Sequence, residues 1–203
     1  MKKKFLALCI ATSVSIGIAG LAQANLITNG SFEDPSFSTG TWQVFTLIPG
    51  WTAVSGDGIE IQNHAAGSPY DGNNLVELDS NNNSAMVQTV NTVLGQNYTL
   101  SFYYSPRPNI PLESNGIEIR WNGALLDTLD QAGGSVTNWS LHTYTVAGAG
   151  LGTSLKFEAI GTNDSLGGYL DKVSLDTVPE PATMLLFGAG ITVLAGLRLK
   201  RKK

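Results

Sequence analysis

The chain has 203 residues, with 12 Lys and Arg against 16 Asp and Glu, and most of its basic residues gather at the two ends. Between the ends, residues 25–177 hold four basic and fifteen acidic side chains, a net charge of −11. Such an acidic body excludes nucleic-acid binding, which needs clustered Lys and Arg. The single cysteine, Cys9, lies before the body, which excludes disulfide scaffolds, zinc–cysteine sites and thiol catalysis there.

The first 24 residues have the pattern of a secretory signal peptide. Lys2–Lys4 form a charged start, an apolar segment runs from Phe5 to Leu21, and Ala22-Gln23-Ala24 is a small-x-small cleavage site. An uncleaved membrane anchor is the alternative interpretation. We therefore expect residues 1–24 to direct export, and residues 25–177 to form one domain large enough to bury a core.

The last 26 residues have three parts in a fixed order. Pro179-Glu180-Pro181 is followed by sixteen uncharged residues, 182–197, and then by the basic tail 198–203. As a helix, the uncharged run spans about 24 Å, and snorkelling of its basic flank extends it toward the ~30 Å of a hydrocarbon core. We expect a transmembrane helix over residues 182–199, with the basic tail in the cytoplasm.

This tripartite end, residues 178–203, resembles the PEP-CTERM sorting signal of Gram-negative bacteria. The resemblance implies recognition by an exosortase, a membrane transpeptidase-like enzyme, and an association with exopolysaccharide-producing, biofilm-forming cells. It also implies export across the inner membrane, a membrane-tethered stage before sorting, and then a place at the cell surface or in the extracellular matrix. The motif would be a processing site of this protein and not an active site.

The body has the pattern of an all-β protein, because short alternating or β-branched runs recur between turn residues and no helical period is sustained. The clearest unit is Gly116–Trp121 and Ala124–Leu129, joined by Asn122-Gly123, a pair that tolerates the positive φ of a tight hairpin. About ten short strands at this spacing predict a jelly-roll β-sandwich. The expected strands are 25–28, 42–47, 58–62, 74–79, 85–90, 97–105, 116–121, 124–129, 139–146, 153–160 and 169–176.

The body also resembles galactose-binding-like jelly rolls, which include many carbohydrate-binding modules. The resemblance rests on Asn25–Glu33 at the start, on Ile48-Pro49-Gly50-Trp51 and on Gly167–Leu175 at the end. It implies the same β-sandwich fold and a function in glycan binding.

The same resemblance implies a structural calcium ion, because such an ion commonly joins the first strand to the last in these folds. It would be held by Glu33 and Asp171, with carbonyls near Asn29 and Ser31. An ordinary solvated acid is the alternative for Glu33, and a turn or backbone cap is the alternative for Asp171. No other cofactor is required.

Sugar binding needs flat aromatic faces with polar groups nearby. Trp51 follows a Pro-Gly turn, Tyr70 lies in a predicted loop, and Tyr104 and Arg107 begin another loop. These four residues are the candidates for ligand binding. For Trp51, packing in the core is an equal alternative.

Catalytic motifs are absent from the sequence: it has no Gly-x-Ser-x-Gly elbow, phosphate-binding loop or His-Glu-x-x-His motif, and no catalytic residue is predicted. We expect an exported, non-catalytic surface protein that binds glycan or associates with an exopolysaccharide matrix. One alternative is a structural or adhesive matrix protein without a sugar pocket. The other is a weak glycan-active hydrolase, which would need two carboxylates close together in a cleft.

Overall fold

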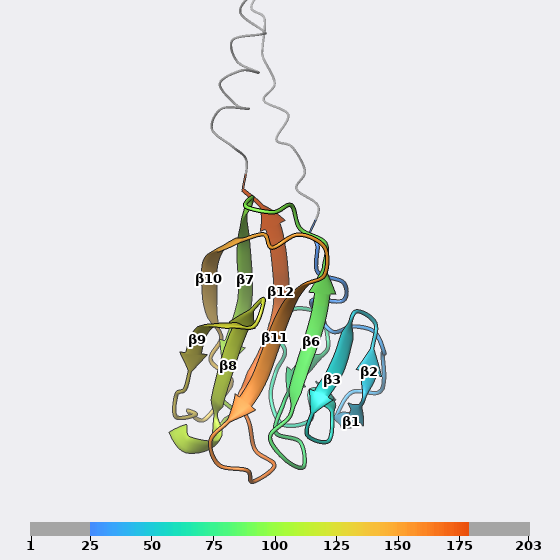
Figure 1. Ribbon diagram of the computed structural model, residues 1–203. Helices are drawn as coiled ribbons and strands as arrows, with labels where there is room; N and C mark the ends of the chain where they lie inside the picture. The colour runs from blue at the N-terminus through green and yellow to red at the C-terminus, as the bar shows by residue number, and fades with distance from the viewer. Residues whose placement is uncertain (1–24, 179–203) are drawn as a thin grey trace, which may run out of the picture.

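The computed structural model describes residues 25–178, which fold into a β-sandwich of twelve strands in two antiparallel sheets (Figure 1). The predicted all-β jelly-roll fold is confirmed, with twelve strands where about ten were expected. No helix within these described residues is long and apolar enough to cross a membrane. The predicted signal peptide, 1–24, and the predicted transmembrane helix, 182–199, lie outside them.

Each sheet has six strands. Sheet A has the order β1 (Thr41–Phe45), β4 (Ile59–Asn63), β5 (Leu75–Glu77), β12 (Tyr169–Thr177), β7 (Asn97–Ser105) and β10 (Ser140–Ala147). Sheet B has the order β2 (Leu47–Ile48), β3 (Trp51–Ser55), β6 (Ala85–Val90), β11 (Thr153–Ile160), β8 (Gly116–Trp121) and β9 (Ala124–Leu129). One short 3-10 helix, Leu112–Ser114, precedes β8.

The local patterns in the sequence place most strands correctly. Asn122 and Gly123 both have positive φ, 48° and 83°, as the predicted β8–β9 hairpin requires. The expected strand 25–28 is wrong: this segment is not a strand, and it is joined to β12 by a bond from the Leu26 N–H to the Leu175 carbonyl, 2.9 Å, and one from the Leu175 N–H to Asn25 Oδ1, 3.0 Å. The expected strand 42–47 divides between β1 and β2, which belong to different sheets.

The core lies between the sheets and is formed by the apolar face of each. Phe157 of β11 meets Phe102 of β7 edge-on, with ring centroids 5.1 Å apart, and contacts Trp51 of β3 at 5.9 Å. All three side chains are fully buried. Burying one large apolar side chain contributes about 1.5–3 kcal/mol, so these three aromatic residues help to hold sheet A against sheet B.

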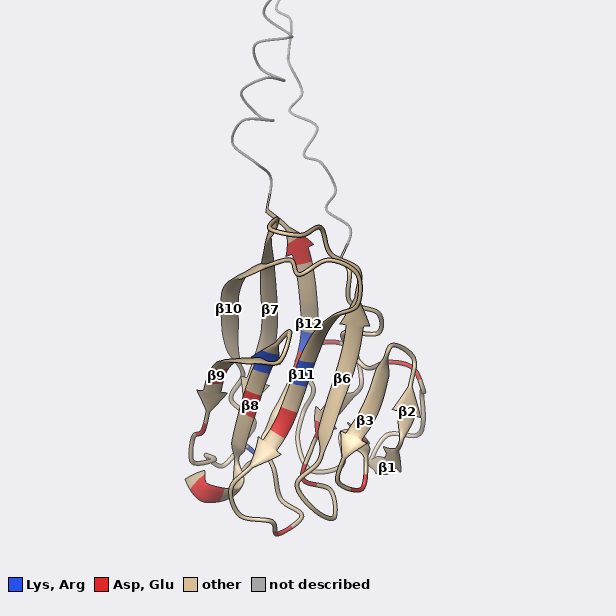
Figure 2. Cartoon of the chain, in the orientation of Figure 1, with Lys and Arg blue, Asp and Glu red and all other residues tan. Residues whose placement is uncertain are grey.

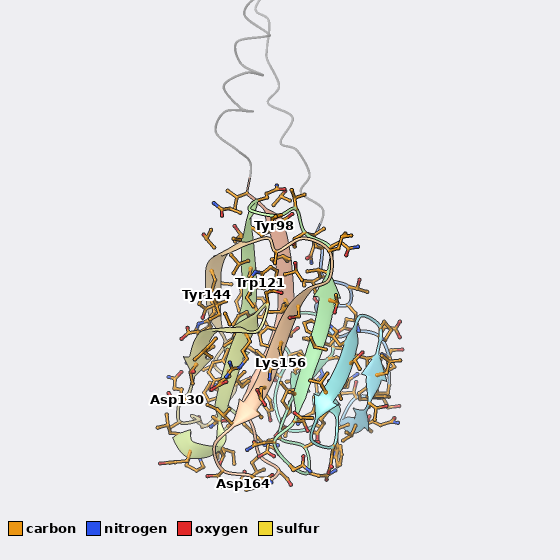
Figure 3. All side chains as sticks on the ribbon, viewed as in Figure 1. Tyr98, Trp121, Asp130, Tyr144, Lys156 and Asp164 are labelled. Carbon is orange, nitrogen blue, oxygen red and sulfur yellow. The ribbon has the colours of Figure 1, made fainter. Side chains whose placement is uncertain are left out.

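Both ends of the described chain leave the sandwich at the same end (Figure 1). The Leu26 N–H bonds to Leu175, and the Val178 N–H bonds to the Asn97 carbonyl at 3.0 Å. We call this the exit end; it lies beside Tyr98, whereas the loop of Asp164 lies at the opposite, far end (Figure 3).

Candidate functional site

A cleft lies on the outer face of sheet A, over β1 and β4. Alternation in β4 sends Ile59 and Ile61 into the core, so Glu60 and Gln62 face outward, and Trp42 of β1 pairs with Gln62. The cleft has a volume of about 430 Å³, within the range of small-ligand pockets. We call it the Trp42 cleft; it is lined by Trp42, Glu60, Gln62, Ala65, Ala66, Ser80, Asn81, Arg107 and Ser165.

The floor of the Trp42 cleft is a network of charged and amide side chains. The Gln62 Nε2 donates to Glu60 Oε1 at 2.8 Å and also to Glu77. The Arg107 Nη1 donates to both carboxylate oxygens of Glu77, at 2.6 and 2.7 Å, and the Gly167 N–H donates to one of them. Because each member is fixed by at least one other, the polar groups of the floor are already oriented.

The electrostatics of this floor are set by burial. Glu77 is fully buried, and desolvation raises its pKa to about 8 even though Arg107 acts in the opposite direction. Burial also raises the pKa of Glu60, which is the cross-strand neighbour of Glu77. Arg107 bonds to Glu77, and its charge also acts against the rise in the pKa of Glu60.

The open groups of the cleft are aromatic and polar. The Trp42 side chain is 56% exposed on the edge strand of sheet A. The buried Ser80 Oγ has no hydrogen-bond partner among the described residues. An exposed indole beside the partly exposed Arg107 guanidinium and the exposed polar side chains of Asn81 and Ser165 is the kind of combination that a sugar ring requires.

Of the four predicted binding residues, Arg107 alone lines this cleft. Trp51 is fully buried between Phe32 and Phe157, with ring centroids 5.7 and 5.9 Å away, and a sugar cannot reach its ring. Tyr104 is also in the core, where its hydroxyl donates to the Asn115 carbonyl at 2.9 Å. The expectation that Trp51 and Tyr104 bind ligand is corrected to a packing role for both.

Tyr70 lies outside the cleft on the same face of the sandwich. Its ring, 42% exposed, stacks on Tyr103 with centroids 3.5 Å apart, and the two hydroxyls are bonded at 2.8 Å. The Lys172 Nζ lies 5.5 Å from the centre of the Tyr70 ring. Tyr103 therefore already covers one of the two faces that Tyr70 could offer to a sugar.

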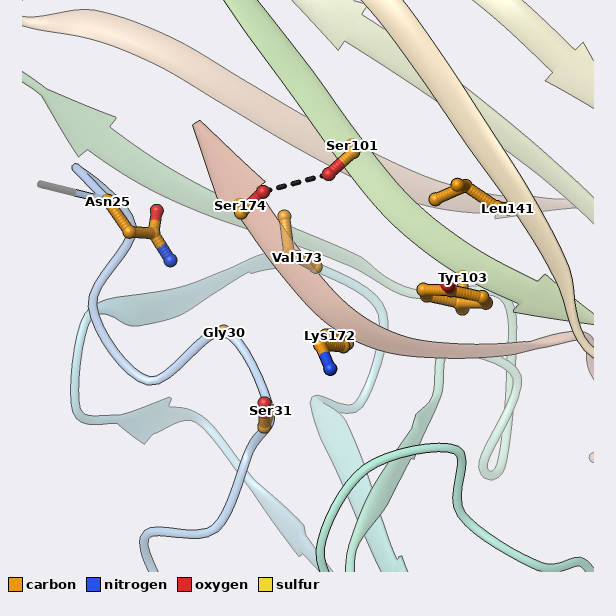
Figure 4. Close-up of a pocket in the computed structure, with 9 residues that line it drawn as sticks. All are labelled: Asn25, Gly30, Ser31, Ser101, Tyr103, Leu141, Lys172, Val173 and Ser174. Atoms are coloured by element: carbon orange, nitrogen blue, oxygen red, sulfur yellow. Dashed lines mark hydrogen bonds between the residues drawn. The ribbon is translucent and has the colours of Figure 1, made fainter. Parts of the chain in front are cut away.

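A second hollow of about 360 Å³ borders Tyr103 (Figure 4). Two of its hydroxyls, Ser101 Oγ and Ser174 Oγ, bond to each other at 2.8 Å, and no Trp lines it. Its lining residues are Asn25, Gly30, Ser31, Ser101, Tyr103, Leu141, Lys172, Val173 and Ser174.

The carboxylates predicted to bind calcium accept backbone N–H groups. Glu33 Oε1 accepts from the N–H groups of Asn73 and Asn74, both at 2.8 Å. Asp171 Oδ2 accepts from Tyr70 and Asp71 at 2.8 and 2.9 Å, which is the backbone-cap role left open for Asp171.

The two other predicted ligands are also engaged elsewhere. The Asn29 carbonyl accepts from the Phe32 N–H and the Trp51 Nε1, and the Ser31 Oγ donates to Asp71. Within residues 25–178 no group of three or more His, Cys, Asp or Glu side chains could hold a metal ion. Because the carboxylates of Glu33 and Asp171 and the carbonyl of Asn29 face N–H donors, these three groups do not fit a calcium ligand shell.

Four residues of the cleft are not among those predicted from the sequence: Trp42, Glu60, Gln62 and Ser80. The alternation in Ile59-Glu60-Ile61-Gln62 carries the signal for two of them, because it sends two polar side chains to the face opposite the core. No local pattern marks Ser80, whose place in the cleft depends on a loop that folds back over β4.

Residues 177–202 match the model of the PEP-CTERM protein-sorting motif. The chain therefore carries this sorting motif at its C-terminal end, as its sequence predicts.

Among curated proteins, a multifunctional-autoprocessing repeats-in-toxin protein of Vibrio cholerae is similar to this chain, with 26% sequence identity over 79% of the chain. A further similarity, 29% identity over 82% of the chain, is to halomucin of Haloquadratum walsbyi. The chain spans only 3% and 2% of the length of these two relatives.

Among solved structures, the K2 cleaved adhesin domain of Lys-gingipain is 13% identical, with a TM-score of 0.51 over 79% of this chain and 100% of that one. The K1 cleaved adhesin domain from Porphyromonas gingivalis W83 also has a TM-score of 0.51 and 13% identity, over 68% of this chain and 98% of that one. TmCBM61, solved with β-1,4-galactotriose, has a TM-score of 0.46 and 14% identity over 76% of this chain and 99% of that one. The adhesin-domain similarity shows a shared fold.

Proposed function

We propose that this protein is an exported, non-catalytic surface protein whose β-sandwich binds glycan, such as an exopolysaccharide, in the Trp42 cleft. The observation that carries the proposal is the exposed indole of Trp42, which lies above a floor of oriented polar groups. A sugar ring would stack its C–H face on the indole, and its hydroxyls would bond to Asn81, Arg107 and Ser165, the polar lining residues that are at least partly exposed.

The arrangement of the two carboxylates favours binding over cleavage. Both oxygens of Glu77 bond to Arg107, and the side chain is fully buried, so it cannot reach a substrate. Glu60 is 5% exposed and accepts a bond from Gln62. A hydrolase needs one carboxyl group on each side of the scissile bond, and neither carboxylate here is free to take that place.

The sorting motif supports the cellular part of the proposal. An exosortase-type enzyme would recognise Pro179-Glu180-Pro181 while residues 182–199 hold the chain in the inner membrane of a Gram-negative bacterium. Processing would then release the domain to the cell surface or biofilm matrix. Mass spectrometry of the exported protein from exosortase-containing cells should find a form that lacks Lys203; an intact C-terminus would contradict this sorting step.

A glycan array probed with residues 25–177, which hold the complete core, tests the binding function. A bound glycan should lose affinity by about tenfold or more when Trp42 is replaced by Ala, the effect of removing a binding hot spot. Tyr70→Ala is the matched control, because it removes an exposed aromatic ring outside the cleft. If no glycan binds, the alternative of a structural or adhesive matrix protein is favoured. If the protein releases new reducing ends from a glycan, the alternative of a hydrolase is favoured.

A further inference from the structure

Two loops at the exit end expose large apolar side chains. Leu94, in the β6–β7 loop, is 79% exposed, and Leu151, in the β10–β11 loop, is 86% exposed. These are the two most exposed large hydrophobic side chains within residues 25–178, and Val93, next to Leu94, is 62% exposed. A single exposed leucine is ordinary, whereas a contiguous exposed apolar patch marks an interaction surface.

The two loops form one surface. The Thr92 N–H bonds to the Gly150 carbonyl at 3.0 Å, and the Gly95 N–H bonds to the Gly148 carbonyl at 2.8 Å. Figure 1 shows both loops at the end of the sandwich from which the chain leaves. We call the surface formed by Val93, Leu94 and Leu151 the apolar tip.

The apolar tip differs from the rest of the domain in charge. Residues 91–96 and 147–152 contain no charged side chain, whereas the body carries a net charge of −11. Figure 2 shows acidic residues spread over the strands and the far loops of the sandwich; the one nearest the exit end is on β12, Asp176, outside the two loops. Anionic lipid headgroups repel an acidic surface, so the uncharged tip is the part of the domain best suited to approach a bilayer.

The length of the connecting chain keeps the tip near the membrane. Val178 is fixed at the exit end by its bond to Asn97, and the uncharged run begins at Ala182. The four steps from Val178 to Ala182 span at most about 14 Å when fully extended. If the run lies in a bilayer, the exit end of the sandwich must lie close to that bilayer's surface.

We propose that the apolar tip docks onto the lipid bilayer while the chain is still tethered, with Leu94 and Leu151 entering the interfacial region. The proposal rests on the membrane tether in the proposed function. Docking would orient the sandwich with its far end outward. The Trp42 cleft, whose lining residues Ser80, Asn81 and Ser165 belong to the far-end loops, would then lie on the part of the sandwich that is distant from the membrane.

Single fluorescent labels on residues 25–203 test the docking, because this part of the chain has no cysteine of its own. Leu94→Cys, Val136→Cys and Thr192→Cys variants would each be labelled with the polarity-sensitive NBD group and reconstituted in phosphatidylcholine nanodiscs. Val136 is the matched control: it is 68% exposed, and its loop bonds to Ser105 at the opposite end of β7 from the tip. Thr192 reports insertion of the uncharged run.

Docking predicts a blue shift of the label at Leu94 and loss of its fluorescence when doxyl lipids are included. The label at Thr192 should also be quenched, and the label at Val136 should not. Quenching at Thr192 without quenching at Leu94 would overturn the docking and leave the tether standing. A lack of quenching at Thr192 would overturn the tether and the docking together, without bearing on glycan binding. Equal quenching at Leu94 and Val136 would show non-specific adsorption and would also overturn the proposal.

Discussion

Glu33 and Asp171 hold opposite ends of the same loop. Asp171 accepts the N–H groups of Tyr70 and Asp71, and Glu33 accepts those of Asn73 and Asn74. Because Asp171 belongs to β12 and Glu33 follows the first segment of the chain, the loop 70–74 joins the beginning of the domain to its end. The loop takes the place that the sequence resemblance assigns to a calcium ion.

We predict that Asp171→Ala lowers the free energy of unfolding by about 1–3 kcal/mol, because the partly buried N–H groups of Tyr70 and Asp71 lose their acceptor. Asp171→Asn should cost less, since its amide oxygen can still accept. Urea unfolding measures both values, and Asp130→Ala, at an exposed acid, is the control. Equal stability of the Asp171→Ala and Asp130→Ala variants would show that the loop bonds contribute little.

Calcium should leave the stability of the domain unchanged. The oxygens of Glu33 and Asp171 are already satisfied by backbone donors, so thermal unfolding with calcium and with a chelator should have the same midpoint. An ion at a hundredfold excess over its Kd would add about 2.7 kcal/mol. If calcium raises the midpoint of thermal unfolding, and Glu33→Gln abolishes this rise, then an ion does bind at Glu33.

Stability should fall as pH rises from about 5 to 8. Burial raises the pKa of Glu77 from 4.5 to about 8 and that of Asp171 from 3.8 to about 7, so the folded chain binds more protons than the unfolded chain in this range. Proton binding by the folded state stabilises it at low pH, and this contribution is lost as pH rises through the raised pKa values. Glu77→Gln should flatten the slope and Glu113→Gln, at an exposed acid, should not; stability that rises over this range would contradict the assignment.

Arg107 should be coupled to Glu77 in a pH-dependent way. Arg107→Met leaves Glu77 buried without its cation and should cost about 3 kcal/mol at pH 8. The cost should shrink at pH 5, where Glu77 is protonated, and a Glu77→Gln/Arg107→Met double variant should recover part of the loss. Additive losses in a double-mutant cycle would mean that the two side chains do not depend on each other.

Strands whose signal is local could be predicted from the sequence. Alternation in β7 buries Tyr98, Leu100, Phe102 and Tyr104, and all four are in the core. The Asn122-Gly123 turn fixes the β8–β9 hairpin because its two positive φ angles are a property of those residues alone.

The positions of the aromatic residues relative to solvent could not be predicted in this way. Trp51 and Trp42 both lie on short strands, but β3 is covered by sheet A, whereas β1 is an edge strand with an open outer face. The cleft also depends on Arg107 reaching Glu77 from a distant loop. Local periodicity shows which side chains share a face, but which face is covered is decided by the packing of segments far apart in the sequence.

The indole signals in a 1H–15N NMR spectrum test the central claim most directly, because the chain has four Trp residues. The Nε1 groups of Trp51, Trp121 and Trp139 donate to backbone carbonyls, whereas Trp42 lies open in the cleft. A glycan found on the array should move the Trp42 signal, assigned with Trp42→Phe, and leave the signals of Trp51 and Trp121 in place. The account would be contradicted if the protein, saturated with that glycan, shows a shifted Trp139 signal and an unchanged Trp42 signal.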